Sequence, residues 1–507
     1  MVILKGSHTV TPAQPTSSGK LWLSESDQVK PLTHAPTIYF YRPTSSDVSI
    51  TSADIDTLRD SLSKVLVQFY PLAGRLHWIG GGRLELDCNA AGAKLFEAES
   101  DASIVDFGDF RPTPEIRELI PRIDYNTPIN ELPLLLVQLT RLCCGGIAVG
   151  VAISHVIVDG QTALQFINTW AKVARGEKLE TTVFLDRTVL HTSESPSAPR
   201  FDHVEFKQPP VLLGRSDASE ERKKETTVVM LKLTRDQVEK LKCKANESRT
   251  EESGRAFSRY EAVAGHMWRC ACKARAHEPE QLTKLRIVVD CRNRLRPPLP
   301  QGYFGNATFP TTPTSLAGEL LAKPLGYASG KIREAVEKVN DEYVRSTIDF
   351  LKSQEDLTPF RTSFHTVGCT QGVFFGNPNL AVTSWVGLPI YDADFGWGKP
   401  IHMGPGSLGF DGKSFILPGR EGDGSFIVAL RLQVPHIDDF EKIFYEDIRV
   451  VVVVWKWWWG GSSNGDGGGG GSDGDGGGCG GGDGSGGDSC GAVVVAGGDG
   501  DVVVTWK

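Results

Sequence analysis

The segment from residue 147 to residue 176 constrains the fold most, because its hydrophobic period changes from two to 3.6 within a few residues. In "IAVGVAISH" bulky apolar residues alternate with small ones, which predicts a strand that buries its bulky face and ends at His155. After the turn "VIVDG", apolar residues recur at helical spacing until Gly176: Ala163, Leu164, Ile167, Trp170, Ala171 and Ala174. A strand, a tight turn and a helix can together hold a side chain at the edge of a cleft.

His155 stands four residues before Asp159 at this turn. A chain with eleven histidines contains such a pair by chance in roughly one case out of two, so the spacing alone carries little information. Two interpretations stay open from the pattern: a structural histidine in the core, or the base of an active site.

The length of 507 residues predicts more than one domain. Apolar spacing predicts an amphipathic helix over residues 55–69, and the glycines at 80–82 predict a hairpin turn. Between residues 176 and 226 the periodicity fades into polar sequence typical of an exposed connection. Beyond this connection we predict a strand at "TVVMLKLT". Two helices are predicted to begin with capping boxes, at "TRDQ" and at "SRYE". A long charged helical stretch is predicted over residues 316–353. We expect an N-terminal domain at 1–205, a connecting loop at 206–226 and a C-terminal domain at 227–448.

The composition changes abruptly in residues 449–507. This tail holds 22 of the chain's 56 glycines, mixed with Ser and Asp, and glycine brings no side chain to bury. A phosphate loop would need a preceding strand, a following helix and usually a lysine at the glycines; the glycine run at 460–491 contains no lysine and no helix is predicted after it. We expect a disordered low-complexity tail and interpret it as a non-native extension, with a natural disordered tail as the alternative.

Charge and apolar patterning argue against several classes of function. The formal net charge of −8 and pI near 5.8 disfavour a nucleic-acid partner. The sequence contains neither a span of about twenty apolar residues nor an N-terminal apolar leader, so we expect no membrane partner and a cytoplasmic location. Cys270 and Cys272 point to different faces of a predicted helix, and a buried stripe explains His266 and Cys270, so we expect no metal.

"SHVIVDG" and "DFGWG", residues 154–160 and 394–398, together resemble the paired signature of the plant BAHD acyltransferases. "YPLAGRL", "VVDCRNRLRPPLPQGYFGN" and "NPNLAVTSWVGLPIYDADFGWGKP" also look like blocks of that family, and the likeness runs from the N-terminus to about Ile448. The resemblance implies an α/β fold with two chloramphenicol-acetyltransferase-like domains, each a mixed β-sheet with flanking helices. It further implies a tunnel at the interface of the two domains. Acyl-CoA is implied as a co-substrate, with no permanently bound cofactor. The segment around residues 383–398 is expected to cross over to the first domain.

The same resemblance implies roles for individual residues. His155 is implied as the general base that acts on the acceptor directly, without an acyl-enzyme. Asp159 is implied as a structural anchor, with Arg292 as its candidate partner. Thr383 and Trp385 match positions at the junction of acyl group and acceptor, where an indole N–H can serve the oxyanion; core packing is the alternative for Trp385. The DFGWG residues are interpreted as architectural: Asp394, Phe395, Gly396, Trp397 and Gly398.

Within the family, the opening "WLSESDQVKPLTHAPTIYFYRP" most resembles spermidine hydroxycinnamoyl transferases. We therefore expect transfer of a hydroxycinnamoyl group to an amine of spermidine by a monomeric enzyme, with carboxylates along the tunnel that hold the other, charged nitrogens. The alternatives are transfer to an alcohol such as shikimate or quinate, and a non-catalytic binder of acyl-CoA or of a partner. Shikimate-using members carry an arginine at the offset where this chain has Thr370, which disfavours a carboxylate-bearing acceptor.

Overall fold

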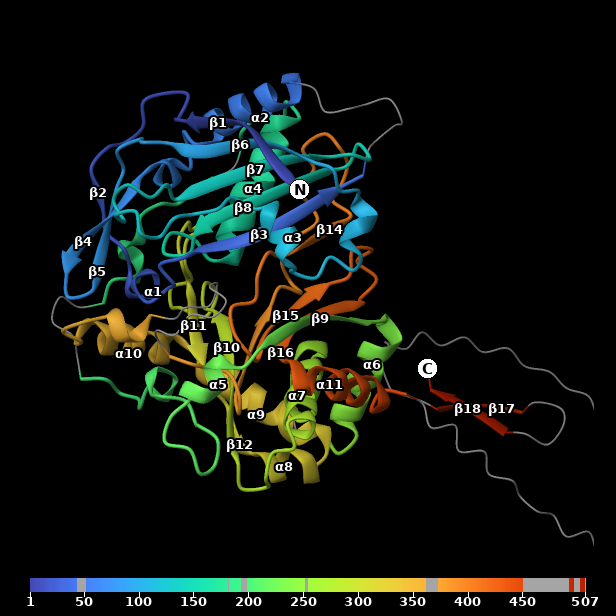
Figure 1. Cartoon of the computed structure of the whole chain (residues 1–507). Coiled ribbons are helices and arrows are strands. Elements are labelled where there is room, and N and C mark those ends of the chain that lie inside the picture. The colour runs from blue at the N-terminus through green and yellow to red at the C-terminus, as the bar shows by residue number, and fades with distance from the viewer. Residues whose placement is uncertain are drawn as a thin grey trace, which may run out of the picture. The chain divides into compact units, whose positions relative to one another are not determined.

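The computed structural model describes residues 1–42, 52–180, 182–192, 198–250, 254–361 and 373–449, together with the strands at 492–496 and 502–506. The chain divides into two compact units, Met1–Glu446 and Asp447–Lys507. The first unit contains two mixed sheets of similar size, each with helices against it, as the family resemblance implies (Figure 1). The domain boundaries at 1–205, 206–226 and 227–448 stay a prediction.

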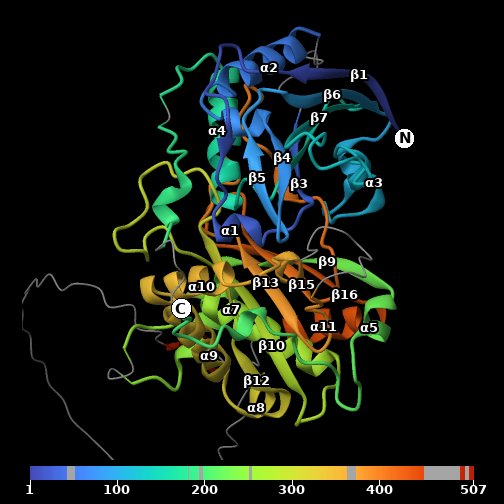
Figure 2. The ribbon, with the colours of Figure 1, turned by 90° about the vertical axis from the view of Figure 1, so that its left-hand side faces the viewer.

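The first sheet carries the strand that ends before His155. Only β6 and β7 are parallel; the other neighbouring strands are antiparallel. In spatial order its strands are β1 (Val2–Val10), β6 (Ala93–Ser100), β7 (Leu135–Leu142), β8 (Ile147–Ser154), β3 (His34–Tyr41) and β14 (His402–Pro405). A smaller three-stranded sheet lies beside it and consists of β2 (Lys20–Leu21), β5 (Arg83–Asp87) and β4 (Arg75–Gly80) (Figure 2). The hairpin expected at the glycines 80–82 joins β4 to β5.

Strand β8 is buried on both faces, although the alternation singled out only its bulky face. The bulky residues pack toward α2 (Ser52–Val65) and α4 (Gly160–Ala174). The small residues face α3 (Pro114–Glu118) and the turn after it. Gly150 is required there, because a Cβ on it would lie 2.1 Å from the carbonyl oxygen of Leu119. The central strand of this sheet is therefore fixed from both sides.

Helix α4 begins and ends as the pattern predicts, whereas α2 is shorter than the predicted helix over 55–69. Its last turn gives way to the 3-10 turn η1 (Tyr70–Ala73), because Pro71 has no N–H and its ring does not fit inside an α-helix. The indole N–H of Trp170 on α4 donates to Ser61 Oγ on α2 at 3.0 Å, which joins the two helices inside the core.

The second sheet is built from later residues and places its open face toward the first. Its strands are β11 (Thr308–Thr311), β10 (Leu282–Asp290), β13 (Leu380–Ser384), β15 (Lys413–Pro418), β16 (Phe426–Gln433) and β9 (Thr226–Leu233), with β12 (Thr314–Leu316) paired to β10. The helices beside it are α6 (Arg235–Asn246), α7 (Arg259–Ala274), α8 (Ala317–Ala322), α9 (Leu325–Lys338) and α11 (Val434–Glu446). Two short helices, α1 (Glu25–Gln28) and α5 (Ser219–Lys223), belong to connecting segments.

Both capping boxes predicted for this half are present, at Thr234 and Ser258. The helical stretch predicted over 316–353 is present and is divided into three helices: α8, α9 and α10 (Asp341–Lys352). Pro324 stands at the start of α9 and Asn340 at the start of α10, where its side chain accepts from the Tyr343 amide at 3.0 Å. A proline and a capping asparagine end helices that charge spacing alone would continue.

Between β13 and β15 the chain leaves the second sheet and returns to it. Strand β14 pairs antiparallel with β3 at the edge of the first sheet, with Met403 opposite Tyr39. This excursion ties the two sheets to each other by backbone hydrogen bonds.

In the second unit, strands β17 (Ala492–Ala496) and β18 (Val502–Trp506) pair antiparallel. The rest of the tail, for which disorder is predicted, lies outside the described residues. Among the described helices, none combines the length and the apolar character that a membrane crossing needs.

Candidate active site

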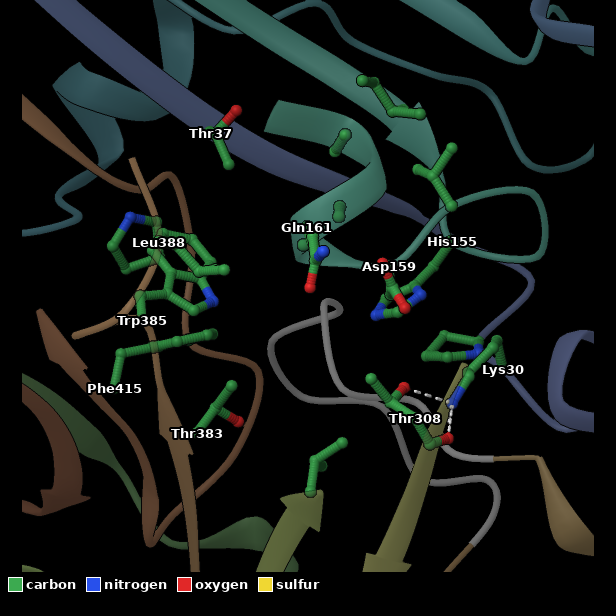
Figure 3. A pocket seen from close by; sticks show the side chains of 18 of the residues that line it. Lys30, Thr37, His155, Asp159, Gln161, Thr308, Thr383, Trp385, Leu388 and Phe415 are labelled. Carbon is green, nitrogen blue, oxygen red and sulfur yellow. Dashed lines mark hydrogen bonds between the residues drawn. The ribbon is translucent and has the colours of Figure 1, made fainter. Parts of the chain in front are cut away.

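A cavity of about 390 Å³ lies between the two sheets and contains His155 on its wall. One side is formed by the end of β8, the first turns of α4 and part of β3. The other side is formed by β10, β13 and β15 of the second sheet. Figure 3 shows Trp385, Leu388 and Phe415 gathered on one side and His155 and Lys30 on the other. The imidazole therefore faces a space that can receive a ligand.

The turn that carries His155 is held by a residue from the other half of the chain. Asn306 Nδ2 donates to the carbonyl oxygens of His155 at 3.0 Å and Val156 at 3.2 Å. The same amide nitrogen donates to Asp27 Oδ1 at 2.9 Å, and Asp27 is itself paired with buried Arg187. These contacts fix the backbone from which the imidazole projects.

His155 is a neutral imidazole at pH 7. Burial, with a further contribution from the positive charge of Lys30, lowers the pKa of His155 to about 4. A neutral imidazole has a nitrogen lone pair that accepts a proton, which a general base needs.

Asp159 lines the cavity, and its carboxylate is part of a buried hydrogen-bond network. Its carboxylate accepts from the amides of Thr162 at 3.1 Å and Ala307 at 3.0 Å, and Arg292 Nη2 lies 2.9 Å from Oδ2. Burial raises the pKa of this carboxyl, but the Arg292 charge and the two amides outweigh burial, so the pKa is lowered. Asp159 also caps the N-terminus of α4. The geometry is that of an anchor, and the residue's role stays a prediction.

Arg292 connects this anchor to its surroundings. Its Nη2 also donates to Thr162 Oγ1 at 2.8 Å and to the Gly305 carbonyl at 3.0 Å, while Nη1 donates to Asp290 at 2.8 Å. Because Arg292 follows β10 and Asp159 begins α4, the pair links the two halves of the cavity.

Trp385 and Thr383 lie on the wall formed by the second sheet. The indole packs against Phe415 with a centroid separation of 4.8 Å. A Cβ on Gly160 would stand 3.7 Å from Trp385 Nε1, so the tryptophan reaches the N-terminus of α4. Thr383 Oγ1 accepts a hydrogen bond from Lys413 Nζ at 2.7 Å. Both residues line the cavity, as their assignment to the acyl-acceptor junction requires.

The DFGWG residues lie outside the cavity lining. Asp394 Oδ1 accepts from the amides of Gly396 at 2.8 Å and Gly398 at 2.9 Å, and both glycines have positive φ. Phe395 meets Trp170 edge-on at 4.8 Å, and Trp397 meets Tyr41 edge-on at 5.4 Å. The loop thus packs on the first sheet and α4, and its architectural role stays a prediction.

Three cationic residues of the cavity were missed by the sequence reasoning: Lys30, Arg286 and Lys413. Burial lowers the pKa of Lys30 to about 8, and burial together with the Arg286 charge lowers the pKa of Lys413 to about 7. The sequence pattern could have indicated Lys413, because this residue begins the strand "KSFILP" and lies on the same strand face as Phe415. Lys30 and Arg286 have no such signal.

The charges on the cavity wall differ from those expected for a polyamine site. Among the described lining residues, the carboxylates are Asp159 and Asp290, and Arg292 binds both. Carboxylates arranged to hold further ammonium groups are absent from that lining. Thr370 stands where shikimate-using members carry an arginine, and its position disfavours a carboxylate-bearing acceptor. This residue lies outside the described residues. The absence of a metal stays a prediction; His266 and Cys270 do share a buried helix face.

A family model described as "Transferase family" matches residues 1–447. The chain is 59% identical over 451 residues to the hydroxycinnamoyl-CoA:piscidic acid hydroxycinnamoyltransferase of Actaea racemosa, which covers 88% of this chain and 100% of that protein. It is 46% identical over 445 residues to the shikimate O-hydroxycinnamoyltransferase of Nicotiana tabacum, with coverage of 87% and 99%. A hydroxycinnamoyl-CoA:5-hydroxyanthranilate N-hydroxycinnamoyltransferase of Avena sativa is 40% identical over 451 residues, with coverage of 88% and 99%.

Solved structures share the fold at lower identity. Vinorine synthase superposes with a TM-score of 0.64 at 24% identity, over 87% of this chain and 96% of that one. The complex of F. graminearum TRI101 with coenzyme A and T-2 mycotoxin superposes with a TM-score of 0.68 at 17% identity, over 83% and 96%. The architecture of two mixed sheets around a central cavity is therefore that of these proteins. With the family match over residues 1–447 and relatives at 40% to 59% identity, the chain belongs to the Transferase family and is an acyl-CoA-dependent acyltransferase of the BAHD type.

Proposed function

We propose that the protein transfers a hydroxycinnamoyl group from its CoA thioester to a hydroxyl group of a carboxylate-bearing acceptor. The observation that carries this proposal is the cationic cavity beside His155, to which Lys30, Arg286 and Lys413 contribute. Such a wall attracts a carboxylate and repels a polyammonium chain. The acceptors named for the three relatives reported above are piscidic acid, shikimate and 5-hydroxyanthranilate, all of them carboxylic acids or their anions.

The proposed reaction is a direct transfer. His155 takes the proton of the acceptor hydroxyl while its oxygen attacks the thioester carbonyl. The C–O bond forms, an oxyanion develops and collapses, and the C–S bond breaks. The departing thiolate then takes the proton from the imidazolium, so His155 returns to its neutral form. Trp385 Nε1–H is the donor proposed to stabilise the oxyanion.

The pKa of His155 also favours a hydroxyl over an ammonium. An alkyl ammonium has a pKa near 10.4 and lacks a lone pair until it loses a proton. With the pKa of His155 lowered to about 4, direct transfer of that proton to the imidazole costs about 9 kcal/mol, and release of the proton to water at pH 7 still costs about 5 kcal/mol. A hydroxyl oxygen already has its lone pairs, and its proton moves to His155 during the attack. The proposal therefore replaces the expected spermidine acceptor with the alternative of an O-acceptor.

The test is an acceptor comparison with purified protein and p-coumaroyl-CoA. Piscidic acid, shikimate, quinate and spermidine are supplied separately, and products are identified by mass spectrometry. We expect ester products with one or more of the acids and no amide with spermidine. Spermidine amides without esters would contradict the proposal, and thioester binding without transfer to any acceptor would support the non-catalytic alternative. The expected monomeric state and cytoplasmic location stay predictions.

A further inference from the structure

Arg286 and Lys413 lie in one row across three adjacent parallel strands. On β10, Arg286 is in register with Ala381 of β13, and Ala381 is in register with Lys413 of β15. All three residues line the cavity, so they share the sheet face that looks toward His155. Neighbouring strands lie about 4.8 Å apart, which places the two cationic residues about 10 Å apart at the backbone, with only a methyl group between them. Both side chains therefore project from neighbouring strand positions on the face that lines the cavity.

Contacts within the second sheet hold the two cationic groups in place. The Arg286 guanidinium stacks over the ring of buried Phe375 at 4.7 Å. Lys413 Nζ donates to Thr383 Oγ1 at 2.7 Å and lies 4.5 Å from the Phe415 ring centroid. Aromatic faces and a hydroxyl orient a cation without neutralising its charge. These contacts place the two cationic groups on the cavity wall.

The charge balance of the lining indicates how much negative charge a ligand brings. The described lining contains the cations Lys30, Arg286, Arg292 and Lys413 and the carboxylates Asp159 and Asp290. With His155 neutral and both lysines protonated, the described lining carries two more positive than negative charges, and a bound anion favours that protonated form although burial lowers the pKa of Lys413 to about 7. Glu205 lies outside the lining, where it receives hydrogen bonds from Tyr343 at 2.6 Å and His203 at 3.0 Å, and its charge partly offsets that of Arg286.

Lys30 supplies a second cationic position, near His155 and away from Trp385 (Figure 3). Its Nζ donates to the carbonyl oxygen of Thr308 at 2.7 Å and to Thr308 Oγ1 at 2.9 Å. An ammonium has three donors, so one N–H remains for a ligand in addition to these two bonds. Lys30 thus adds positive charge to the part of the cavity wall near His155.

We infer that Arg286 and Lys413 form a carboxylate subsite, and that the acceptor is a hydroxy acid with two carboxylates, the second bound at Lys30. This inference rests on the proposed function, because it specifies the acceptor of that reaction. The two carboxylates neutralise the excess charge of the lining, and their separation across the cavity orients the hydroxyl between them toward His155. Each carboxylate accepts charge-assisted hydrogen bonds, which are stronger than neutral ones.

The experiment compares malate with 2-hydroxybutyrate, in which a methyl group replaces one carboxylate of malate. Steady-state kinetics with p-coumaroyl-CoA are measured for the wild type and for Lys413→Met, Arg286→Met and Lys413→Arg. We expect the wild type to prefer malate by about tenfold or more in kcat/KM. Lys413→Met and Arg286→Met raise the KM for malate by about tenfold to a hundredfold and leave the KM for p-coumaroyl-CoA unchanged. Lys413→Arg keeps most of the preference because it keeps the charge.

Lys232→Met is the matched control, because Lys232 is an exposed lysine of β9 in the same sheet and outside the cavity lining. It should change neither KM. Thermal melting of each variant establishes folding, and Arg286→Met provides an independent test if Lys413→Met does not fold.

Distinct outcomes separate this inference from the proposed function. If hydroxy acids are esterified without preference for malate, or if Lys413→Met raises only the KM for p-coumaroyl-CoA, the dicarboxylate subsite is wrong while the proposed function stands. In the latter case the row binds a CoA phosphate instead. If none of the hydroxy acids is esterified and spermidine is, the proposed function itself fails.

Discussion

The substitution Asp159→Asn tests whether Asp159 anchors the fold or takes part in proton transfer. In the folded protein this carboxylate is 3% exposed and receives Arg292 Nη2 and the amides of Thr162 and Ala307. An asparagine amide can accept from one of these donors, but its NH2 group then faces another donor. Removal of one partner from a buried ion pair costs about 3 to 5 kcal/mol in the free energy of unfolding.

Asp290→Asn is the control for this prediction, because Asp290 binds the same arginine at 2.8 Å and is 45% exposed. An exposed pair contributes about 1 kcal/mol or less, so this variant should unfold almost like the wild type. Chemical denaturation at pH 7 followed by tryptophan fluorescence measures both. The pKa of Asp159 is lowered in the folded state, so its contribution is present above the unfolded pKa near 3.9 and is lost as the pH falls. The difference between wild type and Asp159→Asn should therefore narrow below about pH 4.

If Asp159→Asn loses less than about 1 kcal/mol of stability but abolishes turnover and shifts the acid limb of the pH profile, the anchor interpretation is refuted. Asp159 would then act on the protonation of His155. Retained stability together with retained turnover would refute both roles.

Two further perturbations address the reacting centre. His155→Ala should lower kcat by about a hundredfold to ten-thousandfold with little change in thermal stability, and on the acid side the wild-type kcat/KM should fall as the pH approaches 4, where the imidazole becomes protonated. Assays of CoA release over pH 4 to 9 check both. A variant near wild-type activity would remove His155 from the mechanism. Trp385→Phe keeps an aromatic ring against Phe415 but removes Nε1–H. We therefore expect kcat to fall by about tenfold or more, while the KM for the thioester changes little. An unchanged kcat would assign Trp385 to packing alone.

Local patterns were sufficient for the elements next to His155. The change of period from two to 3.6 across residues 147–176 predicts β8, the turn and α4, because side-chain direction along a strand or helix depends on near neighbours. The capping boxes at Thr234 and Ser258 are likewise local, since donor and acceptor lie three residues apart. The helix breaks at Pro324 and Asn340 also had local signals, which charge spacing obscured.

The composition of the cavity depends on contacts between residues distant in the sequence. Arg286 and Lys413 are 127 positions apart and become neighbours only because β10 and β15 both pair with β13 in a particular register. A one-residue slip in either pairing would turn a side chain to the opposite face of the sheet, and no local pattern specifies that register. The sequence by itself determined the family signature, the strand that ends at His155 and the helix that follows Asp159. Only the tertiary structure decided which charges surround the imidazole, because strand pairing, rather than local periodicity, brings those side chains into one cavity.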